Sequence, residues 1–129
     1  MRSELLRVYR EQVGDAIIVH AVGEVDLATA PLLDQALSEA TAAPRTRRVV
    51  VNLTRIHFFG AVGLTVLLTA IHHGYTTGIP VVVVTHPGQP AHRTITITEL
   101  HRKLTLIDSF DHTLPREVGR GMGEYLFRQ

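Results

Sequence analysis

The chain has 129 residues, of which 45% are hydrophobic, and this composition suits one domain with a proper apolar core. A net charge of +1 with only 19% charged residues excludes recognition of nucleic acid or of a membrane surface through a strong overall field. The absence of cysteine excludes disulfides, thiol nucleophiles and thiolate metal sites. The N-terminus has no apolar signal region, and no apolar run reaches the roughly 20 residues of a membrane span, so we expect a cytoplasmic protein.

The first part of the sequence predicts a hairpin followed by a helix. Residues 5–10 and 16–22 are short β-leaning runs, and the turn-prone stretch 11–15 between them indicates an antiparallel connection. Thr29 followed by Pro31 is typical of a helix start, because threonine is a good N-cap and proline suits the first turn. Apolar residues after this start recur at three- and four-residue spacing, which predicts one buried face.

Two apolar runs in the middle of the chain predict central strands with a helix between them. The run 49–53 is apolar except at Asn52, and the run 79–84 is wholly apolar, a pattern typical of strands buried on both faces. The period changes to that of a helix from Gly60, and Gly74 offers a C-terminal cap. The apolar stripe of this helix consists of Leu64, Leu67, Leu68 and Ile71.

The last third of the sequence has weaker signals. The segment 91–100 alternates with strand propensity at its centre, whereas its flanks suit a helix. A short strand is predicted at 104–107, and Thr113 with Pro115 repeats the signal for a helix start. Glycines within 119–129 cost about 1 kcal/mol each in a helix relative to alanine, so we expect this end to be frayed.

Together these elements predict a single α/β domain over residues 1–129. The order of elements favours a mixed, mainly parallel sheet with helices packed on it and an opening antiparallel hairpin strand.

Two stretches of this pattern resemble the STAS domain, the fold of bacterial anti-sigma factor antagonists. The first, GEVDLATAP at 23–31, resembles the family's G-E-(L/V)-D entry to its first helix. The second, VVVNLTRIHFFGAVGL at 49–64, resembles the family's strand, loop and helix start, V-V-(L/V)-D-L-S-x-V-x-F-(I/M)-D-S-S-G-L. The resemblance implies a helix over 91–100, and we adopt it there because tertiary context often overrides local propensity.

The resemblance also implies a function. Antagonists of this family bind an anti-sigma factor with a kinase-like ATP-binding fold and thereby free a sigma factor, which regulates transcription by partner switching. Phosphorylation of a serine in the D-S-S-G segment ends the complex, since a phosphoserine brings about −1.5 to −2 charge to the contact surface.

The sequence departs from the family pattern where switching takes place. Gly60 stands in place of the aspartate, Ala61 in place of the acceptor serine, and Val62 in place of the next hydroxyl residue. Asn52 replaces an aspartate common at the strand end, whereas Asp26 keeps the other carboxylate that we expect at this corner. Because alanine and valine have no hydroxyl, the resemblance implies a form that is not phosphorylated here and binds constitutively.

The expected partner-binding surface runs from this corner along the exposed side of the helix. Its residues are Asp26, Asn52, Gly60, Ala61, Val62, Thr65, Thr69 and His72. Thr54 and Thr65 carry the hydroxyls nearest to the acceptor position, but neither aligns with it.

Other functions find less support in the sequence. The histidines are scattered, and the adjacent pair His72 and His73 points apart on a helix, so we expect no metal site. No paired carboxylates, activated nucleophile or cofactor loop emerges, which indicates neither an enzyme nor a bound cofactor. Two alternatives stay open: a non-switching STAS scaffold subunit that assembles with other STAS proteins in a larger signalling complex, and a small-ligand or nucleotide sensor at Asp26, Asn52 and Gly60. A homodimer is a further possible assembly.

Overall fold

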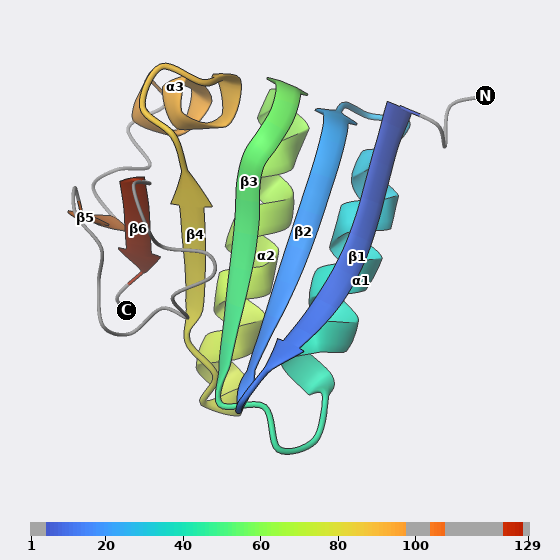
Figure 1. Cartoon of the computed structure of the whole chain (residues 1–129), viewed down its shortest axis with the longest axis vertical. Helices are drawn as coiled ribbons and strands as arrows, with labels where there is room; N and C mark the ends of the chain where they lie inside the picture. Colours follow the sequence, from blue (N-terminus) through green and yellow to red (C-terminus); the bar gives the residue numbers. More distant parts are fainter. Residues whose placement is uncertain (1–4, 98–103, 108–122, 128–129) are drawn as a thin grey trace.

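A mixed sheet with the strand order β1-β2-β3-β4-β6-β5 forms the centre of the molecule in a computed structural model, which describes residues 5–97, 104–107 and 123–127 (Figure 1). The central strands β2, β3 and β4 are parallel, while β1 on one side and β6 and β5 on the other are antiparallel to their neighbours. The strands are β1 (Leu6–Val13), β2 (Ala16–Val25), β3 (Arg48–Phe59), β4 (Val81–Thr85), β5 (Leu104–Ile107) and β6 (Gly123–Phe127). The helices are α1 (Ala30–Ala42), α2 (Ala61–Thr77) and α3 (Pro90–Ile97). The predicted α/β class and mixed sheet are confirmed.

The opening hairpin is tighter than the sequence predicts. Val13 pairs with Ala16, so only Gly14 and Asp15 form the turn, and residues 11–13 belong to β1. Gly14 has a φ of 60°, the left-handed conformation that a two-residue hairpin turn requires and that glycine adopts without strain. The turn therefore leaves β1 and β2 in continuous register over the whole of β1.

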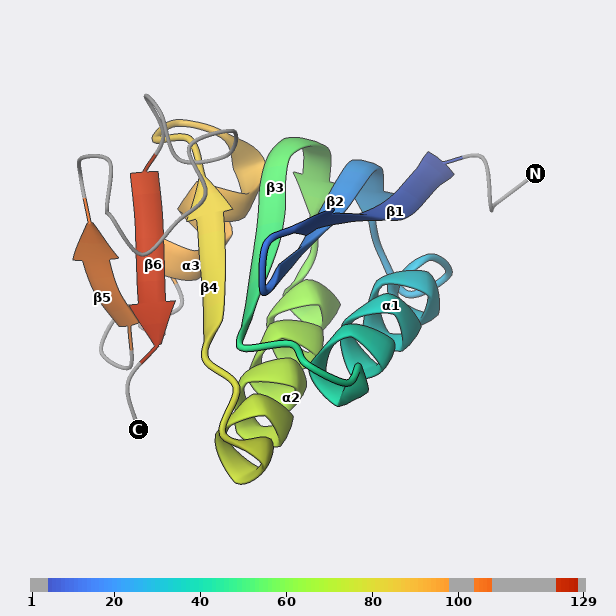
Figure 2. The same ribbon diagram turned by 60° about the horizontal axis from the view of Figure 1, so that its bottom comes forward.

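The main core lies between the sheet and the helices. α1 and α2 lie side by side against the same face, as Figure 2 shows. Alternate residues of β3 point to opposite faces, so Val49 and Val51 join the helix-covered core while Val50 joins a second apolar cluster on the other face. β3 and β4 are both interior strands, which confirms the prediction from the two apolar runs.

Helix α1 follows its sequence pattern closely. It begins after Thr29 with a proline in its first turn, as predicted. Leu33, Leu37 and Ala40 are buried against the sheet, whereas Leu32 on the outer side is 41% exposed.

Helix α2 also packs through its predicted stripe. Leu64, Leu67 and Ile71 are buried, and Leu68 is half-buried. The prediction that Gly74 caps this helix is wrong, since Gly78 has the left-handed φ of 79° and ends it. Gly74 is instead buried inside the last turns, where a Cβ atom would lie 2.3 Å from the carbonyl oxygen of Ile79.

The C-terminal third gives two confirmations and one correction. α3 confirms the helix in the ambiguous segment, because Ala91 and Ile95, one turn apart, are both buried in the core. β5 confirms the predicted strand. The frayed end is contradicted at Gly123, where β6 begins and pairs with β4 and β5 on its two sides. The conformational cost of a glycine affects only that residue, whereas hydrogen bonds to strands on both sides satisfy the backbone groups of β6. The helix predicted from Thr113 lies outside the described residues.

Candidate functional site

The start of α2 lies directly after the end of β3, and backbone hydrogen bonds fix it there. Gly60 is the N-cap residue and has extended backbone angles. Its N–H donates to the carbonyl oxygen of Val25 at 2.9 Å, and its own carbonyl oxygen accepts from the N–H of Gly63 at 2.9 Å. These bonds place the end of β2, the end of β3 and the first turn of α2 at one corner of the molecule.

The aromatic ring of Phe59 packs against this first turn of α2. A Cβ atom on Gly63 would lie 2.5 Å from the ring of Phe59, so only glycine leaves room for the ring at this position. Phe59 is itself buried in the core. The α3 side chain Thr94 donates its hydroxyl to the carbonyl oxygen of Phe59 at 2.9 Å, which ties a third helix to the same strand end.

The two residues that replace the expected hydroxyls lie at the surface of the corner. Ala61 is exposed as the first residue of α2, and Val62 is half-buried against the core. Most N–H groups of a first helical turn have no partner within the helix, and the helix dipole makes this end positive. The corner therefore offers a small apolar surface on a mildly positive backbone.

Two large apolar side chains border this surface. Leu27, just after β2, is 83% exposed, and Phe58, at the end of β3, is 52% exposed. Phe58 lies beside Gly60, where a Cβ atom would be 3.3 Å from the phenyl ring. Leu27 and Phe58 therefore add exposed apolar area at this end of the molecule, which a protein partner would bury.

Asp26 belongs to the corner, but its carboxylate shapes the chain locally. The Oδ1 atom accepts from the N–H groups of Ala28 at 2.9 Å and Thr29 at 3.0 Å. Thr29 occupies the predicted N-cap position, yet its hydroxyl donates to the carbonyl oxygen of Glu24 at 2.7 Å and makes no cap bond to α1. Asp26 thus sets the path from β2 into α1.

The three polar residues further along α2 share one exposed side, as predicted. Thr65, Thr69 and His72 are all exposed and are spaced by four and three residues. Thr69 and His72 line a groove of about 380 Å³ between α1 and α2, whose other polar lining includes Asp34 and Ser38 of α1. The exposed side of α2 is therefore continuous with the face of α1.

Asn52 does not belong to this corner, and the predicted grouping of Asp26, Asn52 and Gly60 is wrong. β3 runs on to Phe59, so Asn52 lies about 23 Å from the strand end at about 3.3 Å per residue. Its side chain points to the face without helices, since its neighbours Val51 and Leu53 point into the helix-covered core. A ligand at the start of α2 could not contact Asn52.

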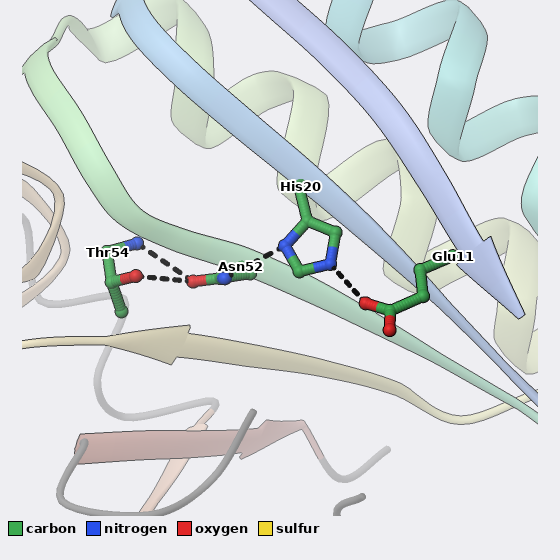
Figure 3. Close-up of polar contacts among 4 residues, drawn as sticks. All are labelled: Glu11, His20, Asn52 and Thr54. Carbon is green, nitrogen blue, oxygen red and sulfur yellow. Dashed lines mark hydrogen bonds and ion pairs between the residues drawn. The ribbon is translucent and has the colours of Figure 1, made fainter. Parts of the chain in front are cut away.

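On that face Asn52 is the centre of a row of hydrogen bonds that the sequence does not reveal (Figure 3). Its Oδ1 atom accepts from the backbone N–H of Thr54 at 3.1 Å and from the Thr54 hydroxyl at 2.7 Å. Its Nδ2 group lies 3.0 Å from Nδ1 of His20, and Nε2 of His20 lies 2.8 Å from a carboxylate oxygen of Glu11. Tyr9 stacks on His20 with ring centroids 4.8 Å apart. These residues lie on three different strands, and the pairing register of the strands brings them together. The sequence does not reveal this register.

Metal-binding and membrane-spanning features are absent from the described residues. Within 5–97, 104–107 and 123–127, no three His, Cys, Asp or Glu side chains converge to hold a metal ion. None of the helices in this part of the chain has the length and hydropathy to span a membrane.

Comparison with known proteins identifies this architecture. The model of the STAS domain family matches residues 8–113. An anti-sigma factor antagonist from Mycobacterium paratuberculosis is 31% identical, with a TM-score of 0.66 over 75% of this chain and 80% of that one. The comparison with curated protein sequences gives no match.

Two further structures share the fold. The anti-sigma factor antagonist SpoIIAA in its unphosphorylated form has a TM-score of 0.57 and 16% identity, over 74% of this chain and 84% of that one. A protein named Mglu is 25% identical with a TM-score of 0.51, but the match covers 58% of this chain and only 18% of Mglu. The same fold thus occurs both as most of a small protein and as a small part of a larger one.

Proposed function

Because the chain belongs to the STAS domain family, we propose that it is an anti-sigma factor antagonist that acts by binding and is not an enzyme. Its partner is an anti-sigma factor with a kinase-like ATP-binding fold, and binding in the cytoplasm frees a sigma factor. The observation that carries this proposal is the 31% identity to an anti-sigma factor antagonist over three quarters of the chain.

The start of α2 is the docking surface in this proposal. Ala61 is exposed there, and Leu27 and Phe58 beside it present apolar area that a partner would bury. Thr65, Thr69 and His72 extend the surface along α2. Asn52 is left out because it lies on the other face of the sheet.

The docking surface has no hydroxyl at the acceptor position, so the complex is not released by phosphorylation there. Ala61 occupies the acceptor position and carries only a methyl group. Thr54 is 9% exposed and its hydroxyl donates to Asn52 on the other face, which argues against it as a substitute acceptor. Thr65 is exposed, but it lies one turn further along α2.

Binding by purified anti-sigma factor, measured by calorimetry with and without ATP, tests this proposal. We expect the parent chain to bind equally under both conditions. Ala61→Asp should weaken binding by at least about 2 kcal/mol, because it buries an unpaired charge in the contact. An aspartate at the first position of α2 interacts favourably with the helix dipole, so unfolding of the variant would not explain a loss of binding.

Two further variants complete the test. Ala42→Asp adds the same charge to another exposed alanine at the end of α1 and should bind like the parent. Ala61→Ser should bind normally without ATP, gain one phosphate in intact-mass spectrometry, and then be released. Unchanged binding by Ala61→Asp would exclude this corner as the interface and favour the scaffold or ligand-sensor alternatives. A stoichiometric phosphate on the parent chain would show that another hydroxyl is the acceptor.

A further inference from the structure

Strand β1 forms one edge of the sheet, and its outer side has no partner strand among the described elements. Hydrogen-bonding groups in an antiparallel pair alternate in direction along each strand. Because Val13 and Ala16 close the two-residue turn, residues 13, 11, 9 and 7 direct their backbone groups to β2. Residues 6, 8, 10 and 12 therefore direct theirs away from the sheet.

Apart from its charged side chains, this edge lacks the usual features that prevent pairing. Natural edge strands are commonly short, bulged, interrupted by proline or covered by another element. β1 has eight residues in unbroken register with β2 and contains no proline. Its charged residues have both signs: Arg7 and Arg10 are positive, and Glu11 is negative, and all three are exposed.

We propose that β1 pairs with β1 of a second copy of this chain, antiparallel and across a twofold axis, so that one sheet runs through both copies. A twofold axis perpendicular to the sheet keeps the helices of both copies on the same side. Directly opposed residues then share a face, and residues 6, 8, 10 and 12 bond to the same set in the second copy.

Charge selects one register for this pairing. When Tyr9 faces Tyr9 of the second copy, Arg7 faces Glu11 at both ends of the tyrosine pair, which gives two opposite-charge contacts. These three positions are non-hydrogen-bonded pairs, in which opposed side chains are closest. The next register places Arg10 opposite Arg10, a like-charge contact that is unfavourable.

The hydrogen-bond row on the open face holds two of these side chains in place. Tyr9 stacks on His20. Nε2 of His20 lies 2.8 Å from one carboxylate oxygen of Glu11 (Figure 3). Asn52 and Thr54 in turn orient His20 from β3. Side chains that are ordered before association lose less entropy on binding, which favours this edge as an interface.

The helix side of the same edge offers apolar area. Leu6, Val8, Leu32, Gln35, Ala36 and Glu39 line a groove of about 340 Å³ between β1 and α1. In the proposed register Val8 faces Arg10 of the second copy, whose aliphatic stem can cover the groove while its guanidinium reaches toward Glu39. Leu32, which is 41% exposed, would be shielded as well.

Charge reversal tests the pairing through the dimer dissociation constant, measured by sedimentation or light scattering over a dilution series of the full chain. We expect a dimer that Arg7→Glu weakens about tenfold or more, since both ion pairs become repulsive. The double variant Arg7→Glu with Glu11→Arg should restore most of the affinity, because each position meets the other in the second copy. Arg93→Glu changes the net charge equally at an exposed position of α3, away from β1, and should stay close to the parent. A monomeric parent chain, or no rescue by the double variant, would overturn the proposal.

Single cysteines test the register, because the chain has none of its own. Opposed non-hydrogen-bonded residues have Cα atoms about 4.5 Å apart, within the range of about 4.4–6.8 Å that a disulfide spans. Tyr9→Cys should therefore form a covalent dimer under mild oxidation. Val8→Cys and Arg10→Cys face themselves only in the neighbouring registers and should remain monomeric on a non-reducing gel. Equal cross-linking at all three positions would indicate random collision and contradict the proposed register.

Discussion

At the scale of single residues, Asn52 shows how one side chain fixes the chemistry of its neighbours. The backbone N–H of Thr54 is an obligatory donor, so the amide oxygen of Asn52 must face it and the amide NH₂ must face His20. Nδ1 of His20 then has to accept, which leaves the ring hydrogen on Nε2, directed at Glu11. A backbone group on β3 thereby determines the tautomer of a histidine on β2.

The first residue-scale prediction concerns this row. Asn52→Ala removes a hydrogen-bond partner from both Thr54 and His20, and we expect it to lower the free energy of unfolding by about 1–3 kcal/mol. Nitrogen-15 NMR of the imidazole should show the Nε2–H tautomer in the parent and a mixture in the variant. A parent ring with its hydrogen on Nδ1 would contradict the assignment. Thr76→Ala, which removes an exposed hydroxyl from α2, is the control and should change stability by less than about 0.5 kcal/mol.

At the scale of elements, the helices were more predictable than their ends. The spacing of apolar residues predicted α1 and α2. A helix that covers a sheet needs one apolar face, and this face produces a local pattern in the sequence. The end of α2 was misplaced because Gly74 and Gly78 are both plausible caps from sequence. Only the tertiary contact with Ile79 shows that Gly74 is needed for close packing and Gly78 for the turn.

The element-scale prediction compares two adjacent leucines of α2. Leu67 is 1% exposed in the core, whereas Leu68 is half-buried at the side of the helix. Leu67→Ala should cost about 2–5 kcal/mol of unfolding free energy, and Leu68→Ala clearly less, because its site is open to solvent and leaves no closed cavity. Chemical denaturation of both variants measures the difference. An equal cost for the two would mean that the stripe of α2 is placed wrongly on the sheet.

At the scale of the whole molecule, the sequence predicted the central architecture but not what lies on the two sides of the sheet. The apolar runs predicted β3 and β4 because interior strands must be apolar on both faces. The row of hydrogen bonds from Glu11 to Thr54 could not be predicted, because it joins three strands whose pairing register the sequence does not reveal. The same reason explains why Asn52 was placed at the α2 corner: the length of β3 was underestimated by six residues at its C-terminal end, 53 against 59.

The whole-molecule prediction separates binding from stability at the end where β2, β3 and α2 meet. Leu27→Ser should leave the free energy of unfolding within about 0.5 kcal/mol of the parent, because this side chain is 83% exposed. It should nevertheless lower affinity for the anti-sigma factor about tenfold, if the partner buries the leucine. Calorimetry and denaturation on the same variant provide both values. Leu32→Ser, in the groove between α1 and β1, should not change this affinity, and an effect there would extend the docking surface beyond the start of α2.

The contact between Gly63 and Phe59 limits how a signal could travel from this corner. Sliding α2 by one residue along its axis would bring the Cβ atom of Val62 or Leu64 against the phenyl ring, where no space exists. A ratchet-like displacement of the helix is thus sterically blocked at its first turn. A charge added at Ala61 would therefore act on a partner at the place where it is added, without a one-residue shift of α2.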